Sequence, residues 1–295
     1  MPREIFARTI LNSVQQPDPW FGLKYSMNLY RGCQHGCIYC DSRSTCYQLG
    51  SLDDIRVKTN ALELLADQLP RKRMRGTIGF GSMNDPYMPV ERKYRLTRGA
   101  LEIINKNRFP VHLLTKSDLV LRDIDVLQEI HKVYAAVSFT ITTADDRLAA
   151  ELEPGAPRPT ARFEAMQALS DAGILTGATM MPVLPFLEDD PENITAIVEK
   201  AHQAGASYLI PAFGVTLRAG SREYFYRQLD QRFPGVKERY HQRFGNQYQC
   251  SSPRWKELTR LFTSLCEQYN LMGNIPVFEP EKVTAPPGQM KLFED

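Results

Sequence analysis

Short apolar runs alternate with amphipathic segments along the first two thirds of the chain. A short apolar run bounded by turn residues is typical of a buried strand, and apolar residues three and four positions apart are typical of a helix. The pattern predicts six strands, at residues 25–30, 77–80, 111–114, 133–141, 174–181 and 207–213. Helices are predicted between them, at residues 60–69, 97–105, 123–131, 160–173 and 193–203.

This order of elements indicates the fold class. Strands that alternate with helices form parallel sheets, because each helix carries the chain back through a right-handed crossover. We therefore expect an α/β protein, a partial (β/α)6 TIM-like barrel of parallel strands. The chain of 295 residues is long enough for such a barrel and an appendage. After residue 213 only helices are predicted, at 222–233, 236–244 and 254–269, which indicates a C-terminal helical cap.

This pattern divides the chain into four parts. Residues 1–24 have no clean period, and Pro17 and Pro19 argue against a regular element, so an N-terminal arm is expected. The barrel is expected over residues 25–214 and the C-terminal helical extension over residues 215–273. Residues 274–295 are rich in proline and acidic residues and are expected to form a tail.

Three cysteines lie close together just after the first predicted strand, in the sequence YRGCQHGCIYC. Cys33, Cys37 and Cys40 are spaced so that one short turn can direct all three thiolates at one centre, as cysteines do around iron-sulfur clusters. A [4Fe-4S] cube has four irons, so three thiolates leave one iron free to chelate a small molecule. The alternative is a zinc knuckle, which needs a fourth ligand from His35, Asp41 or Cys46.

The motif CxxxCxxC, with an aromatic residue before its last cysteine, resembles the signature of the radical SAM superfamily. That resemblance implies that the open iron binds S-adenosylmethionine and that the reduced cluster cleaves it to methionine and a 5′-deoxyadenosyl radical. It also implies that Cys33, Cys37 and Cys40 are the cluster ligands and that Tyr39 packs against the cluster or the adenine. An electron donor such as flavodoxin or ferredoxin is implied as a partner.

Candidate binding residues follow the strands, since chemistry in such barrels lies at the carboxyl ends of the strands. After the second strand, Asn84 and Asp85 can accept hydrogen bonds from an ammonium group. After the third strand, Lys116 offers a cation to a carboxylate. On the fourth strand, Ser138 and Thr140 share one face, so both are expected to point into the barrel.

Several short motifs resemble those of the spore photoproduct lyase-like branch of the superfamily: SMNDPY, LLTKS, SFTI, and LEP followed by RFEA. By this resemblance Ser82, Asn84, Lys116, Ser138 and Arg162 contact S-adenosylmethionine or brace its site. Arg162 lies in the first turn of a helix, where a cation is unfavourable unless it has an anionic partner.

Two positions depart from that branch. The lyase proper has a hydrogen-donating cysteine in the loop after the second strand, and here the residue is Met83. It also has a tyrosine after the last cluster cysteine, and here the residue is Asp41. A thioether has no S–H bond to donate. We therefore expect radical initiation to be retained and the substrate step to differ.

Positive charge is concentrated in one segment. The chain has a net charge of +2, but residues 211–260 hold ten Lys or Arg and four Asp or Glu. Aromatic residues are interleaved with these cations, a combination that suits a nucleic acid. An equal alternative is a set of amphipathic helices that close the barrel. Nucleic acid is the leading substrate, and a peptide or small metabolite is the alternative. A non-catalytic zinc or iron-sulfur protein that binds nucleic acid is the alternative of another class.

The remaining features indicate where the protein works. Six cysteines, no leader-like start and no long apolar run predict a cytoplasmic protein with reduced thiols and no membrane span. Cys266 lies on an apolar helical face and is expected in the core. A structural role is favoured for Cys46, although it could face the cavity. Cys250 lies in a polar stretch that indicates no role.

Overall fold

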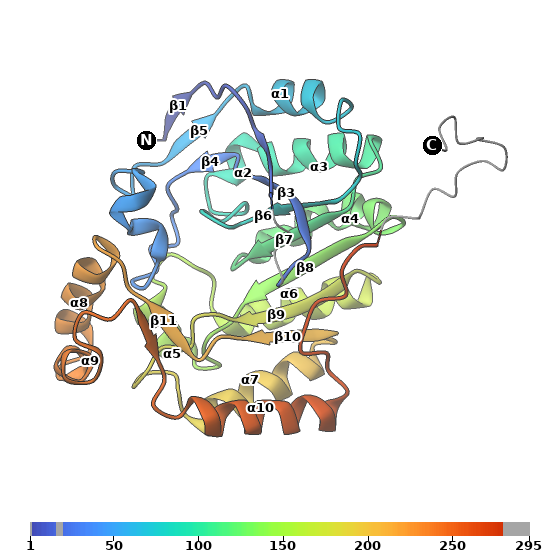
Figure 1. Ribbon diagram of the computed structural model, residues 1–295. Helices are drawn as coiled ribbons and strands as arrows, with labels where there is room; N and C mark the ends of the chain where they lie inside the picture. Colours follow the sequence, from blue (N-terminus) through green and yellow to red (C-terminus); the bar gives the residue numbers. More distant parts are fainter. Residues whose placement is uncertain (1, 16–19, 280–295) are drawn as a thin grey trace, which may run out of the picture.

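The computed structural model describes residues 2–15 and 20–279 (Figure 1). Its largest sheet has seven strands in the order β10-β9-β8-β7-β6-β3-β2. Every neighbouring pair is parallel except β2 with β3. These strands are β2 (Leu11–Ser13), β3 (Leu23–Met27), β6 (Thr77–Phe80), β7 (Val111–Thr115), β8 (Ala135–Thr140), β9 (Leu175–Met180) and β10 (Tyr208–Pro211). The six parallel strands are the six predicted ones, and the partial barrel is confirmed.

Helices cover the outer face of this sheet. The predicted crossover helices are α1 (Ala61–Gln68), α3 (Leu96–Lys106), α4 (Ile124–His131), α6 (Pro159–Asp171) and α7 (Pro191–Gln203). Short helices that the pattern did not indicate are α2 (Glu91–Tyr94), α5 (Asp146–Leu152) and the 3-10 turns η1 (Asp41–Arg43), η2 (Thr45–Tyr47) and η3 (Asp118–Asp123). Helix α10 (Trp255–Tyr269) packs against α7, so it extends the outer layer of helices.

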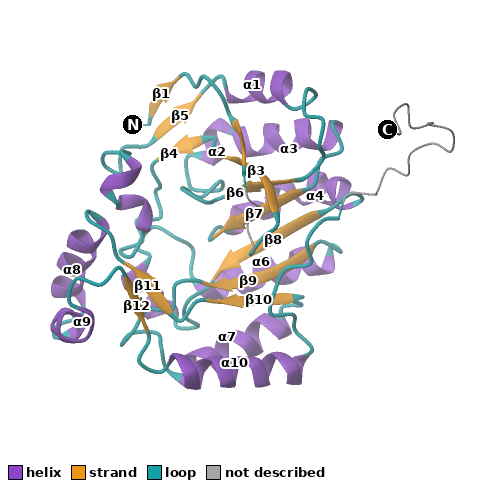
Figure 2. Ribbon diagram, in the orientation of Figure 1, coloured by secondary structure: helices purple, strands orange, loops and turns teal. Residues whose placement is uncertain are grey.

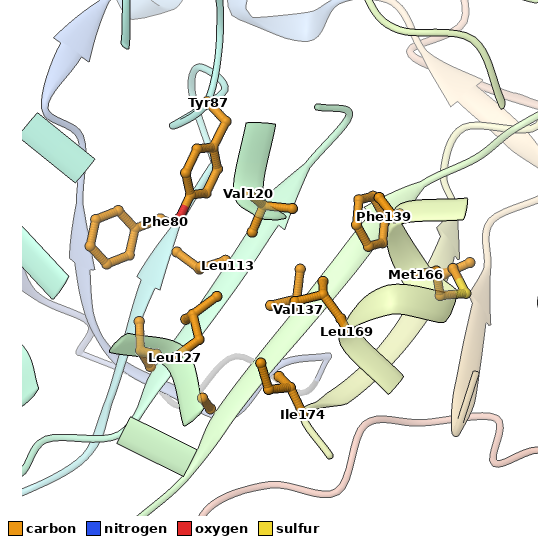
Figure 3. Packing of buried hydrophobic residues seen from close by; sticks show 14 of the residues in the cluster. Phe80, Tyr87, Leu113, Val120, Leu127, Val137, Phe139, Met166, Leu169 and Ile174 are labelled. Atoms are coloured by element: carbon orange, nitrogen blue, oxygen red, sulfur yellow. The ribbon is translucent and has the colours of Figure 1, made fainter. Parts of the chain in front are cut away.

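The main core lies between the sheet and the helices. Figure 3 shows Val137 and Phe139 of β8 packed near Met166 and Leu169 of α6. All four side chains are fully buried. Burial of one such side chain contributes about 1.5–3 kcal/mol. Alternate residues of β8 face the other way, into the barrel, as the alternation predicted for Ser138 and Thr140.

Side chains close the barrel at the amino ends of its strands. The Ser138 hydroxyl lies 2.8 Å from Nε2 of His112 and 2.7 Å from the hydroxyl of Tyr208. The ring of Phe21 stacks on His112 with centroids 4.7 Å apart. Ile275 is buried beside Tyr208. The start of the expected tail therefore packs against the barrel, while residues 280–295 lie outside the described residues.

A second, small sheet is built from strands that precede and follow the cysteine turn in the sequence. It consists of β1 (Arg3–Ile5), β5 (Arg56–Lys58) and β4 (Tyr30–Arg31), in the order β1-β5-β4. The expectation of an arm without regular elements is therefore wrong, since β1 and β2 both lie in it. The first predicted strand is also divided, because β3 ends at Met27 and residues 30–31 pair with β5 instead.

The C-terminal cap consists of α8 (Ser221–Arg232), α9 (Val236–Phe244) and a two-stranded sheet of β11 (Gly214–Thr216) with β12 (Gln249–Ser251) (Figure 2). The sheet was not predicted, because each strand has three residues and two helices separate them. Phe225, Tyr240 and Phe244 are buried in the cap. These three rings therefore fit the alternative of amphipathic helices that close the barrel, whereas Trp255 is 49% exposed. Among the described residues no helix is long and apolar enough to cross a membrane.

Candidate active site

The three cysteines of the motif line one cavity at the carboxyl ends of the strands. Its volume is about 380 Å³. The cysteine turn, the loops after β6, β7 and β9, and strand β11 of the cap all contribute to its lining. The sequence-predicted residues in the lining are Cys33, Cys37, Cys40, Tyr39, Ser82, Asn84, Asp85, Lys116 and Thr140. Met83 and Asp41, the two departures, line it as well.

Backbone hydrogen bonds hold the cysteine turn from two sides. Cys33 N donates to the carbonyl of Leu52 at 2.9 Å. On the other side, Ile38 N donates to Leu152, and Gly155 N donates to His35, both at 2.9 Å. The turn also needs glycine at position 32, where φ is +79° and a Cβ would lie 2.6 Å from the Leu52 carbonyl. The ligands are thus positioned by residues far away in the sequence.

The donor set suits an iron-sulfur cube. All three cysteines are free thiols. Burial and the charge of Asp85 raise the pKa of Cys33, and backbone N–H groups of His35 and Asp85 lower it, with a net rise to about 12. Cysteine thiolates are the usual ligands of such cubes, and three of them leave one iron open.

The residues that a zinc knuckle would recruit as a fourth ligand have other partners. His35 lies with Nδ1 3.1 Å from the Gly155 carbonyl and Nε2 3.1 Å from Asp85. Asp41 accepts hydrogen bonds from Ser44 at 2.9 Å and Tyr47 at 2.8 Å. Cys46 is exposed and lies 3.8 Å from Nη1 of Arg218.

Asp85 joins the loop after β6 to the loop after β7. Its carboxylate accepts hydrogen bonds from the Thr115 hydroxyl and from Lys116 N, both at 2.7 Å, and from Tyr87 N at 2.8 Å. Burial raises the pKa of Asp85, but the charge of His35 and these hydrogen bonds outweigh it and lower the pKa to about 2. Asp85 is therefore charged at neutral pH, and its oxygens are committed to protein donors.

A buried charged cluster lies behind Cys37 and Cys40. Glu153 accepts hydrogen bonds from Tyr39 and Arg162, and Lys116 Nζ lies 3.7 Å from its carboxylate. Burial raises the pKa of Glu153, but the charges of Arg162 and Lys116 outweigh burial and lower it. The two cations exceed the one carboxylate, which suits negative thiolates alongside.

Two sequence-predicted residues lie outside the cavity lining. Arg162 is almost fully buried and donates to Glu153, to the Thr140 carbonyl at 2.8 Å and to the Pro157 carbonyl at 2.9 Å. It has the anionic partner that its helical position required, and it braces the site. Ser138 lies beneath the cavity, where His112 and Tyr208 already use its hydroxyl. Its placement does not support contact with S-adenosylmethionine.

The remaining predicted residues have clear positions. Ser82 is exposed, while Asn84 is buried and donates from Nδ2 to the Tyr30 carbonyl. Thr140 Oγ1 accepts a hydrogen bond from Thr179 at 3.2 Å. Sequence reasoning missed Glu153, one of 34 acidic residues, because only the fold brings it to Tyr39. The one available signal was its place in the motif LEP, next to Pro154, which belongs to the resemblance.

Two residues of the cavity lining, Asp41 and Tyr47, contact Arg218 of the C-terminal extension. Arg218 Nη1 lies 2.6 Å from the Tyr47 hydroxyl and 3.3 Å from Asp41, and Nη2 donates to the Tyr248 hydroxyl at 2.8 Å. These contacts join the segment after the cysteine turn to the C-terminal extension, and they were not predicted because Arg218 is 171 residues from Tyr47.

Comparisons with known proteins agree with this geometry. Residues 27–208 match the family model described as the radical SAM superfamily. An uncharacterised protein of Mycobacterium tuberculosis is 30% identical over 98% of this chain and 87% of its own length. The radical SAM Nα-GlyT isomerase of Pseudomonas phage M6 is 26% identical, and the match covers 86% of this chain and 48% of that protein.

Among solved structures, the fold is similar to that of spore photoproduct lyase complexed with dinucleoside spore photoproduct. The TM-score is 0.68 with 19% sequence identity, and the match covers 90% of this chain and 78% of that chain. At this identity the likeness concerns the fold.

Proposed function

This chain belongs to the radical SAM superfamily, and we propose that Cys33, Cys37 and Cys40 hold its iron-sulfur cluster. The protein is a radical SAM enzyme with a [4Fe-4S] cluster and S-adenosylmethionine as its cofactors. The observation that carries the assignment of ligands is that three free thiols line one cavity at the carboxyl ends of the strands. The bound cluster, once reduced, supplies the electron that cleaves S-adenosylmethionine to a 5′-deoxyadenosyl radical.

The residues around the cavity have separate roles in this proposal. Lys116 directs a cation to the carboxylate of S-adenosylmethionine, and Tyr39 packs at the cluster side. Ser82 and Thr140 offer hydroxyls, and Asn84 offers an amide oxygen. Asp85 and Arg162 hold the loops in place. An electron donor such as flavodoxin or ferredoxin supplies the reducing electron.

The substrate we propose is a nucleic acid or one of its nucleotides. The similar lyase structure holds a dinucleoside, which supports this class. The positive charge of the cap gives this substrate class less support than the sequence indicated, because most cations of the cap have partners within the protein. Arg232 pairs with Glu151 at 2.8 Å, Arg254 with Glu257 at 2.7 Å, and the Arg239 guanidinium lies 4.2 Å from the Phe186 ring centroid. This engaged cap favours a peptide or small metabolite as the second candidate.

Anaerobic cleavage of S-adenosylmethionine tests the assignment. The protein is reconstituted with iron and sulfide and reduced with dithionite, and 5′-deoxyadenosine is measured by chromatography. Cys33→Ala, Cys37→Ala and Cys40→Ala are each expected to abolish 5′-deoxyadenosine, because an iron loses its ligand. Cys46→Ala and Cys266→Ala are the controls and should retain it. Full activity in any of the three motif variants would refute the ligand assignment.

A further inference from the structure

A second cavity adjoins the active site on the side of the small sheet. Its volume is about 290 Å³, and it shares Met83 and Asn84 with the main cavity. The rest of its lining comes from the end of β1 and the residues after it, from the segment 28–32 that includes β4, and from Leu49 and Lys58. A ligand in this cavity would therefore lie beside the loop that carries Met83.

Two cations in this lining have no acidic partner. Among the described residues no carboxylate lies within 4.0 Å of the Arg31 guanidinium or the Lys58 ammonium. Acidic residues nearby in the sequence are paired elsewhere, Asp53 with Arg43 at 3.1 Å and Asp54 with Arg56 at 2.7 Å. Lys58 Nζ donates one hydrogen bond, to the Asn28 carbonyl at 2.6 Å, and keeps two further donors.

The electrostatics of the cavity favour an anion. Burial lowers the pKa of Lys58, and the positive charge of Arg31 lowers it further. Two like charges held together in a partly buried place repel each other, and an anion between them relieves this repulsion. Oδ1 of Asn28, in the same lining, is buried without a hydrogen-bond partner in the described part of the chain, so it can accept a hydrogen bond from a donor group of the same ligand.

An aromatic ring lies at the edge of the same cavity. Phe6 lines it and is 83% exposed, the largest exposure among the large hydrophobic residues that the structure describes. An exposed ring beside two unpaired cations is the arrangement that single-stranded nucleic acids use, with the base on the ring and the phosphate on the cations.

We propose that this cavity binds the phosphate of a nucleotide unit of the substrate, with Arg31 and Lys58 on the phosphate and Phe6 under a base. This inference rests on the proposed radical function, because it names the class of substrate that reaches the active cavity past Met83. The cap arginines are mostly engaged, so the free cations of the small sheet bind the backbone of the substrate instead.

Binding to the reconstituted enzyme under anaerobic conditions tests the proposal. The probes are a fluorescent single-stranded ten-residue oligodeoxynucleotide, followed by anisotropy, and thymidine monophosphate and inorganic phosphate as competitors. The variants are the double change Arg31→Gln with Lys58→Gln, and Phe6→Ala. A matched control, Arg71→Gln with Lys132→Gln, removes two surface cations that pair with Asp67 and Glu129. The formation of 5′-deoxyadenosine without substrate is measured for every variant.

We expect the double variant to weaken oligonucleotide binding roughly tenfold and to lower the slope of log affinity against log salt by about 0.7, the value for one phosphate contact on a single strand. Phe6→Ala should weaken binding of the monophosphate and leave inorganic phosphate unchanged. Oligonucleotide binding equal to that of the wild type in the double variant would refute the site, and so would an equal loss in the control. If inorganic phosphate competes as well as thymidine monophosphate, the site does not recognise the base, and the proposal of a nucleotide ligand is refuted.

The two proposals can fail separately. If the double variant forms 5′-deoxyadenosine at the wild-type rate but does not bind the oligonucleotide, the anion site stands on its own measurement. If no variant and no wild-type preparation forms 5′-deoxyadenosine, the proposed cluster assignment fails, whatever the binding result.

Discussion

The hydroxyl of Tyr39 donates a hydrogen bond to the carboxylate of Glu153, which lies 114 residues further along the chain. Both side chains are buried, and Glu153 also accepts from Arg162 and lies 3.7 Å from Lys116. One carboxylate therefore lies against two cations, the buried Arg162 and the partly buried Lys116, and fixes the tyrosine that precedes Cys40. The cysteine turn depends on this contact as much as on its own sequence.

Glu153→Gln should destabilise the protein and reduce its iron content. The change keeps the shape of the side chain but leaves the buried Arg162 without its carboxylate partner and removes one negative charge near Lys116, which costs about 3–5 kcal/mol. The measurements are the melting temperature and iron per chain after reconstitution. Glu151→Gln is the matched control, because Glu151 is half exposed and its pair with Arg232 contributes less than about 1 kcal/mol. Equal losses in both variants would contradict the role of Glu153.

Gly155→Ala should displace the cysteine turn. A Cβ at this position would lie 2.1 Å from the carbonyl oxygen of Gln34, which is backbone and cannot rotate away. We expect reconstituted iron to fall severalfold. Gly173→Ala is the control: its φ of +76° strains any side chain, but no atom lies within 4 Å of its Cβ. It should cost about 1 kcal/mol of stability and leave iron binding intact. Normal iron content in Gly155→Ala would show that the turn is not held there.

The sequence predicted the barrel well because every parallel strand carries its own short apolar signal. The six strands at β3 and β6 to β10 needed no knowledge of their partners. The sheet of β11 and β12 escaped prediction, since pairing across two helices leaves no local pattern. The two interpretations of the cap's aromatic residues could not be separated for a related reason. Periodicity shows that Phe225 and Tyr240 lie on helices but not whether their faces meet each other or solvent.

The site could be predicted where chemistry depends on residue type and spacing, as for Cys33, Cys37 and Cys40. It could not be predicted where a side chain works through distant partners. Ser138 and Thr140 share one face of β8, yet only Thr140 lines the cavity, because His112 and Tyr208 occupy the level of Ser138. Arg218 had no local signal that separates it from ordinary surface charges, and Glu153 had only its place next to Pro154.

The stability of the protein should fall as the pH rises toward 8, because unfolding releases a proton from Glu188. Burial raises the pKa of Glu188 from 4.5 to about 8, and hydrogen bonds from Thr142 and Leu184 N offset this only in part. The folded state thus keeps a proton that the unfolded state loses near pH 4.5. This proton therefore stabilises the folded state fully below pH 4.5. The stabilisation is lost as the pH rises from 4.5 to about 8.

Glu188→Gln should remove this part of the pH dependence. The glutamine amide can donate to Thr142 while its oxygen accepts from Leu184 N, so both contacts are kept. We expect the loss of stability between pH 5.5 and pH 8.5 to be smaller in the variant by roughly 2–4 kcal/mol. Melting temperatures of both proteins, measured anaerobically across this range, give the comparison. Parallel curves would show that Glu188 does not titrate there.

The identity of residue 83 leads to a negative prediction. Met83 lines the active cavity, in the loop where the lyase-like resemblance places a hydrogen-donating cysteine. Its carbonyl accepts from the Ser42 hydroxyl at 3.0 Å, which ties this loop to the cysteine turn. A thioether has no S–H bond. Cys46 is exposed and lies 3.8 Å from Arg218, so it does not replace the missing thiol in the cavity.

The wild-type enzyme should therefore not restore thymine from spore photoproduct. The measurement is an anaerobic incubation with an oligonucleotide that bears the lesion, with thymine and 5′-deoxyadenosine followed by chromatography in the same samples. We expect 5′-deoxyadenosine without thymine, and Met83→Cys, which returns an S–H donor to the cavity, should raise any thymine yield. Many turnovers by the wild type would contradict the argument from Met83. Loss of those turnovers in Cys46→Ala would then identify Cys46 as the donor, reached by a movement of the turn Thr45–Tyr47.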